Sequence, residues 1–146
     1  MQTESQVVAI GHVIQLAVAP VFLLTGVSGL LTVLTNRLAR IIDRARTLEE
    51  RLARAAEAQQ PPLYAELGQL SQRGRLINRA VRLCTICALL ICAVIVALFV
   101  GAFLSTDLSI LIGLIFTAAM LALFCGLLTF LQEISVAIKT LRIGPH

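Results

Sequence analysis

Polar side chains recur along the first long apolar segment of the chain, and they are the first candidates for chemistry. Histidine and glutamine stand early in this segment, and hydroxyl residues follow at spacings of three and four, which keep them on one face of a helix. The candidate polar face consists of His12, Gln15, Thr25, Ser28, Thr32 and Thr35. In lipid, such a face either contacts another helix or lines a polar pathway. Contact with another helix is the simpler interpretation.

A second polar group follows where this apolar segment ends. It consists of Asn36, Arg37, Arg40, Asp43 and Arg44. Asp43 is within helical pairing distance of Arg40 and Arg46, and it has an alternative partner across a hairpin in Arg79. The simplest interpretation is a helix end anchored at lipid head groups, and a gate or ligand site is the alternative.

No residue pattern in the chain is typical of catalysis or metal binding. Cys84 and Cys87 form a C-x-x-C pair, but neither a second pair nor a nearby histidine completes a zinc site. His12 and His146 are the only histidines, and neither has an obvious partner. Phosphate-binding glycine loops and hydrolase motifs are absent. We therefore expect no enzyme, no catalytic residue, no cofactor and no metal, and we interpret the two cysteines as small buried residues.

The elements that carry these residues are predicted from the distribution of charge. Of the 146 residues, 58% are hydrophobic and 14% are charged, whereas a soluble domain has about 25% charged residues. Charged residues are absent between Glu4 and Arg37, between Arg82 and Asp107, and between Asp107 and Glu133. A membrane-spanning helix needs about 20 apolar residues. We predict three transmembrane helices, at about 7–36, 83–104 and 108–131.

The basic residues predict how these helices are oriented. Ten of the twelve Lys and Arg residues lie between Arg37 and Arg82, and the other two are Lys139 and Arg142. Because cytoplasmic segments carry the excess of Lys and Arg, we predict an external N-terminus and a cytoplasmic C-terminus. This topology, with attraction to anionic lipid, accounts for the net charge of +4 without nucleic-acid binding.

The segment between the first two spans has the apolar periodicity of paired helices. Apolar or small residues alternate at spacings of three and four, which is the seven-residue repeat of paired helices. They form two sets: Leu38, Ile41, Ala45, Leu48, Leu52 and Ala55, then Leu63, Leu67, Leu70, Gly74, Ile77, Val81 and Cys84. Pro61 and Pro62 separate the sets and predict a break there. In the turn before the third span, Ser105 and Thr106 are expected to cap the helix and Asp107 to lie in its first turn.

Together these patterns predict an all-α integral membrane protein. It has three transmembrane helices and a cytoplasmic antiparallel αα-hairpin, coiled-coil-like, between the first and second. The predicted segments are an N-terminal transmembrane helix at 1–36, a basic helical hairpin at 37–82, a transmembrane hairpin at 83–131 and a cytoplasmic tail at 132–146.

Two sequence motifs resemble those of a known family. They are HVIQLAVAPVFLLTG at residues 12–26 and LTNRLARIIDRAR at residues 34–46. The sequence resembles a family of small bacterial membrane proteins that is defined only as a domain of unknown function. The resemblance implies a multi-pass protein of the bacterial inner membrane with three spans, and it implies no activity, cofactor or site residue.

Three functions are compatible with these observations. The first is a non-enzymatic protein that acts through helix association, as a homo-oligomer or as an accessory to another membrane protein. The second is a small oligomeric channel lined by the polar face of the first helix, with Arg37, Arg40 and Arg44 at its inner mouth. The third is a protein that binds anionic lipid head groups through its arginines. The lipid bilayer is a partner in each case, and nucleic acid in none.

Overall fold

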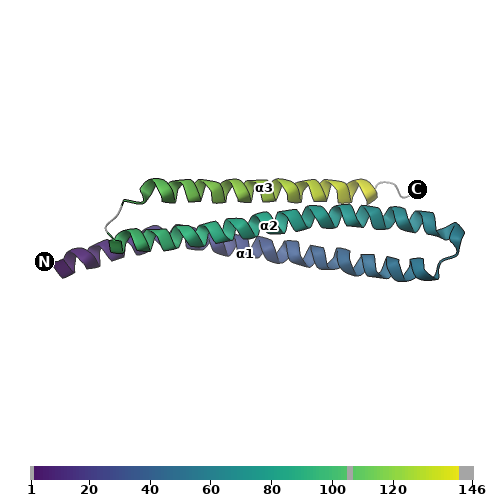
Figure 1. Ribbon diagram of the computed structural model, residues 1–146, viewed down its shortest axis with the longest axis horizontal. Helices are drawn as coiled ribbons and strands as arrows, with labels where there is room; N and C mark the ends of the chain where they lie inside the picture. The colour runs from purple at the N-terminus through teal and green to yellow at the C-terminus, as the bar shows by residue number, and fades with distance from the viewer. Residues whose placement is uncertain (1, 105–106, 142–146) are drawn as a thin grey trace. The chain divides into compact units, whose positions relative to one another are not determined.

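The computed structural model describes residues 2–104 and 107–141, and its long elements are all α-helices. They are α1 (Gln2–Arg54), α2 (Gln60–Leu104) and α3 (Ser109–Leu141), labelled in Figure 1. Each is long and apolar enough to cross a membrane. For the described residues, this confirms the predicted all-α fold with three membrane-length helices.

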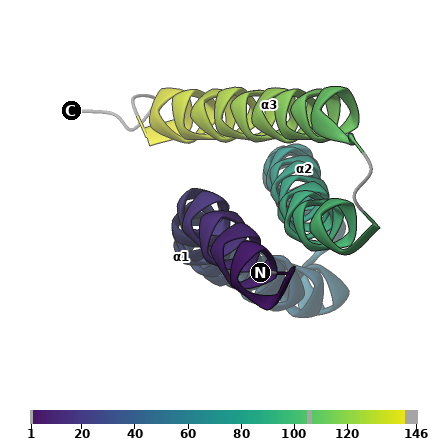
Figure 2. The same ribbon diagram turned by 90° about the vertical axis from the view of Figure 1, so that its left-hand side faces the viewer.

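The helices contribute to two compact units. Unit 1 comprises Met1–Leu31 and Leu83–Phe124, and unit 2 comprises Thr32–Arg82 and Cys125–His146. Each unit therefore takes a segment from each of the three helices. Figure 2 shows α1 nearly end on, from its N-terminus. The candidate site described below lies within unit 2.

The connection between α1 and α2 forms where the two prolines predict a break. Beyond Arg54, Ala56 is extended and a 3-10 helix, η1 (Glu57–Gln59), follows. The backbone N–H of Ala55 donates to the Leu52 carbonyl of α1, and the side-chain amide of Gln60 donates to the Ala55 carbonyl. Pro61 and Pro62 then occupy the first turn of α2, where no intrahelical partner exists for the N–H group that proline lacks.

Buried positions along α1 and α2 recur every seven residues. In α1 they include Val13, Pro20, Val27, Leu34, Ile41 and Leu48, and in α2 they include Leu70, Ile77, Cys84 and Ile91. Every position of the two predicted apolar sets is buried or half-buried. A Cβ atom placed on Gly74 would lie 3.6 Å from Ile41 Cγ2, so the two helices are in van der Waals contact at this point in unit 2.

α3 continues beyond the predicted third span. The span was expected to end at about Leu131, and the helix runs on to Leu141. Part of the predicted tail at 132–146 is therefore helical, and residues 142–146, which include Arg142 and His146, lie outside the described residues. Glu133 lies in this extension of the helix and is buried in unit 2.

The N-terminus of α3 is capped by an acidic side chain. Asp107 Oδ1 accepts hydrogen bonds from the backbone N–H of Ser109, at 3.0 Å, and from its hydroxyl. Asp107 thus precedes the helix and does not lie in its first turn, where it was predicted. These hydrogen bonds lower the pKa of the Asp107 carboxyl, the side-chain bond most strongly. The predicted caps Ser105 and Thr106 lie outside the described residues.

Candidate functional site

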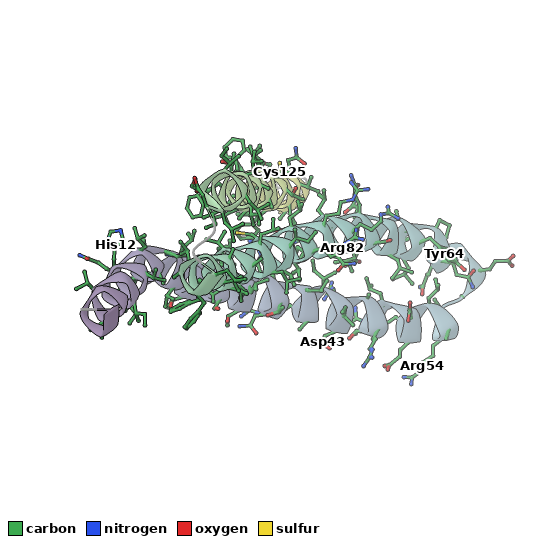
Figure 3. The ribbon with its side chains drawn as sticks, turned by 60° about the vertical axis from the view of Figure 1, so that its left-hand side comes forward. His12, Asp43, Arg54, Tyr64, Arg82 and Cys125 are labelled. Carbon is green, nitrogen blue, oxygen red and sulfur yellow. The ribbon has the colours of Figure 1, made fainter. Side chains whose placement is uncertain are left out.

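The predicted polar face of α1 lies on the outside of the described chain. All six of its residues are exposed: His12, Gln15, Thr25, Ser28, Thr32 and Thr35. Figure 3 shows His12 on the N-terminal part of α1. Among the described residues this face is therefore left uncovered, and it remains available to lipid, water or another helix.

Hydroxyl groups on this face bond to their own helix. Thr25 donates to the Val21 carbonyl at 3.3 Å, and Ser28 donates to the Leu24 carbonyl at 3.0 Å. Thr35 donates to the carbonyl of Thr32 at 3.1 Å. Because these donors are satisfied within α1, the face can pack against an apolar neighbour without leaving a hydroxyl unbonded.

Two glycines, which have no side chain, lie in the same region of α1. A Cβ atom placed on Gly26 or on Gly29 would meet nothing within 4 Å among the described residues. Gly29 lies four residues after Thr25 and three before Thr32, so small side chains continue along one line of the helix. Such lines of small residues allow the backbones of two membrane helices to approach closely.

The most distinctive feature of unit 2 is a buried carboxylate between two arginines. Glu133 of α3 has an exposed fraction of 0%. Arg73 of α2 donates to Glu133 Oε1 from Nε at 3.1 Å and from Nη2 at 3.0 Å. Nη2 of Arg37, on α1, lies 3.3 Å from the other oxygen, Oε2. One acid thus links all three helices.

The two oxygens of Glu133 are satisfied unequally. Oε1 accepts both hydrogen bonds from Arg73, whereas Oε2 accepts no hydrogen bond from the described residues, although Arg37 is within ion-pair distance. A buried carboxylate is costly unless it is paired. We therefore attribute most of its stabilisation to Arg73, and a purely electrostatic part to Arg37.

Arg37 is positioned by a second residue of α3. Its guanidinium carbon lies 5.3 Å from the centre of the Phe130 ring, which is within the range of a cation–π contact. Phe130 and Glu133 are three residues apart and therefore share a face of α3. The two contacts together hold Arg37 against α3 in unit 2.

The other residues of the predicted boundary cluster are exposed. Arg44 donates to Glu66 Oε1 from Nε at 3.3 Å and from Nη2 at 2.9 Å, and this pair links α1 to α2. Asn36, Arg40 and Asp43 belong to none of the three ion pairs found among the described residues. Asp43, labelled on α1 in Figure 3, therefore pairs with neither Arg40 nor Arg79 among these contacts.

Four arginines line a cleft of about 250 Å³ between α1 and α2 in unit 2. Its walls are Arg37, Arg40, Ile41, Arg44, Leu70 and Arg73. The four residues from α1 follow one another at spacings that keep them on one face, and the two from α2 are three residues apart. The cleft is therefore a concave, basic surface with an apolar wall.

The cysteine pair lies elsewhere, in unit 1. Cys84 and Cys87 both have an exposed fraction of 0%, and neither forms a disulfide. Their burial agrees with the interpretation of small packed residues. Among the described residues, no three His, Cys, Asp or Glu side chains gather closely enough to hold a metal ion.

Sequence reasoning identified the arginines of α1 but not their partners. It missed Glu66, Arg73 and Glu133 as site residues, because each pairs with a residue far away in the chain. One sequence signal points to Glu133. The small residues Ala119 and Gly126 precede it at intervals of seven residues, which places the three on one face of a helix. The structure buries all three.

Comparison with known proteins identifies a family. The model of the family described as "Protein of unknown function (DUF2721)" matches residues 17–143. Neither the comparison with curated proteins nor that with solved structures gave a match. The chain belongs to this family of unknown function.

Proposed function

We propose that this member of the DUF2721 family is a non-enzymatic protein of the bacterial inner membrane that associates with a second copy of itself through α1. The observation that carries the proposal is the exposed line of small residues on α1. In lipid, helices associate by close packing and not by the hydrophobic effect, so a narrow, exposed helix face is the feature that favours a partner.

The membrane placement is part of the proposal and is supported by charge. Each of the three long helices has an apolar stretch of membrane length. All twelve Lys and Arg residues lie either between Arg37 and Arg82 or after Glu133. With the basic segments in the cytoplasm, the α1–α2 connection forms the tip of a cytoplasmic, coiled-coil-like hairpin, and the N-terminus lies outside.

The contact surface that we propose is centred on Gly29. Thr25, Gly29 and Thr32 are all exposed, and a Cβ at Gly29 would have open space. The hydroxyl of Thr25 is bonded to its own helix, so the surface needs no polar partner. A second α1 presenting the same face provides a matching surface, as in the self-complementary interfaces of two-fold dimers.

The oligomeric state in a nanodisc, measured by native mass spectrometry, tests this proposal. We expect the wild type to be a dimer or a larger homo-oligomer. Gly29→Leu adds a bulky side chain to the proposed surface and is expected to shift the protein to monomer. Gly113→Leu is the matched control, because Gly113 on α3 is also exposed with no atom within 4 Å of its Cβ position.

Each outcome of this measurement discriminates between functions. A closed ring of four or more copies would favour the channel, with first helices around a pore, and would call for ion-flux assays in liposomes. A wild-type monomer that crosslinks to a different membrane protein would favour an accessory subunit over self-association. A monomer that crosslinks to nothing in its native membrane would contradict helix association altogether.

A further inference from the structure

We propose that the arginine cleft of unit 2 binds a phosphoryl group. The cleft is the surface lined by Arg37, Arg40, Ile41, Arg44, Leu70 and Arg73. The phosphoryl group belongs either to a lipid head group or to a soluble phosphate, and both present the same chemistry to the arginines. This inference does not depend on self-association through α1.

The arginines of the cleft carry more charge than their acidic partners neutralise. Four arginines line it, and two acids pair with them. Glu133 faces Arg37 and Arg73, and Glu66 faces Arg44. Arg40 takes part in none of these ion pairs. Two positive charges are therefore left, and a phosphoryl monoester carries about −1.5 to −2 near neutral pH.

The arginines of the cleft also supply hydrogen-bond donors. A guanidinium has five N–H donors. Arg44 uses two of them on Glu66, and Arg73 uses two on Glu133. Further donors on these side chains, with those of Arg40, are available to an anion in the cleft. The planar arginine fork suits phosphate oxygens better than a lysine ammonium would.

Two of the binding arginines are already held in place. Arg37 is fixed by Glu133 and by the Phe130 ring, and Arg73 is fixed by two hydrogen bonds to Glu133. Side chains that are ordered before binding lose less entropy when the anion arrives. Glu133 is therefore a positioning residue for the cleft.

The place of the cleft in the chain favours a phosphoryl anion over an acidic peptide. Arg37 is the first charged residue after the long charge-free run of α1, so in the proposed topology the cleft lies at the level of the lipid phosphates. Ile41 and Leu70 supply an apolar wall beside the arginines. A phosphate attached to an apolar group can therefore contact the arginines and the apolar side chains of the cleft together.

The test uses the full-length protein in nanodiscs and two probes. Inorganic phosphate is titrated by calorimetry into nanodiscs of neutral phosphatidylcholine. Separately, native mass spectrometry counts phosphatidic acid that remains bound after extraction from mixed vesicles. Arg40→Gln and Arg44→Gln remove charge from the cleft. Arg46→Gln is the control, since Arg46 is an exposed arginine of α1 outside the cleft.

We expect Arg40→Gln and Arg44→Gln to weaken binding of at least one probe about tenfold, and Arg46→Gln to leave it unchanged. Circular dichroism and thermal melting without the probe verify that each variant is folded. Binding of phosphate would assign the site to a soluble anion, and binding of phosphatidic acid alone would assign it to a lipid. Failure of both probes, or an equal loss in Arg46→Gln, would overturn the proposal.

Discussion

Glu133 shows how a single residue joins the three helices of unit 2. It is an acid with an exposed fraction of 0%, and arginines from α1 and α2 approach it on either side. Arg37 was identified from the sequence as a candidate, because it follows a charge-free run. Its contact with Glu133 was not identified, because sequence spacing alone does not reveal a pairing between residues 37 and 133.

Removing Arg73 tests this role of Glu133. Arg73→Ala leaves a buried carboxylate with only Arg37 nearby, so we expect the free energy of unfolding to fall by about 3 kcal/mol. Arg44→Ala breaks the exposed pair with Glu66 and is expected to cost less than about 1 kcal/mol. Unfolding by denaturing detergent, followed by circular dichroism, measures both values. Equal effects of the two variants would contradict a stabilising role specific to Glu133.

The cap of α3 leads to a pH-dependent prediction. The hydrogen bonds from Ser109 lower the pKa of Asp107 in the folded protein. Their stabilisation is therefore fully present above the ordinary Asp pKa of about 3.9, and it is lost as pH falls through the lowered folded value. We expect Ser109→Ala to melt at a lower temperature than wild type at pH 7. The difference should shrink below about pH 4, and a constant or growing difference would contradict this.

At the scale of elements, the break between α1 and α2 was predictable and the packing of α3 was not. Pro61 and Pro62 fix the start of α2 through local backbone chemistry, which is readable from sequence. The burial of Glu133 was not predicted, because pairing with arginines of two other helices is a tertiary effect. This pairing allows a charged residue to lie on the packed face of α3.

The packing between α1 and α2 makes a prediction at two glycines of α2. A Cβ at Gly74 would be in ordinary contact with Ile41 at 3.6 Å, and a Cβ at Gly68 would meet nothing. Alanine fits both sites and forms helix better than glycine. We therefore expect Gly74→Ala and Gly68→Ala each to raise the free energy of unfolding by about 0.5–1 kcal/mol. A loss of stability in Gly74→Ala alone, measured by the same detergent unfolding, would show that the helices approach more closely than described.

At the scale of the whole chain, sequence alone predicted the fold class and the number of membrane-length helices. Long charge-free runs are a direct consequence of the cost of charge in lipid, so they can be read without a structure. The arginine cleft could not be predicted as a whole, because Arg73 and Leu70 come from a different helix than Arg37 and Arg40. The sequence also did not predict that the polar face of α1 is exposed. Periodicity identifies which residues share a face, but not which other residues cover it.

The central claim is that two copies meet at Gly29 of α1, and position-specific crosslinking tests it most directly. In a variant with its four cysteines replaced by alanine, Gly29→Cys is treated with a short thiol crosslinker in native membranes, and Gly113→Cys on α3 serves as the control. Melting temperatures verify that both variants retain the fold. We predict a covalent dimer for Gly29→Cys and little or none for Gly113→Cys. Equal crosslinking at the two positions, or crosslinking at position 113 alone, would contradict association through this face of α1.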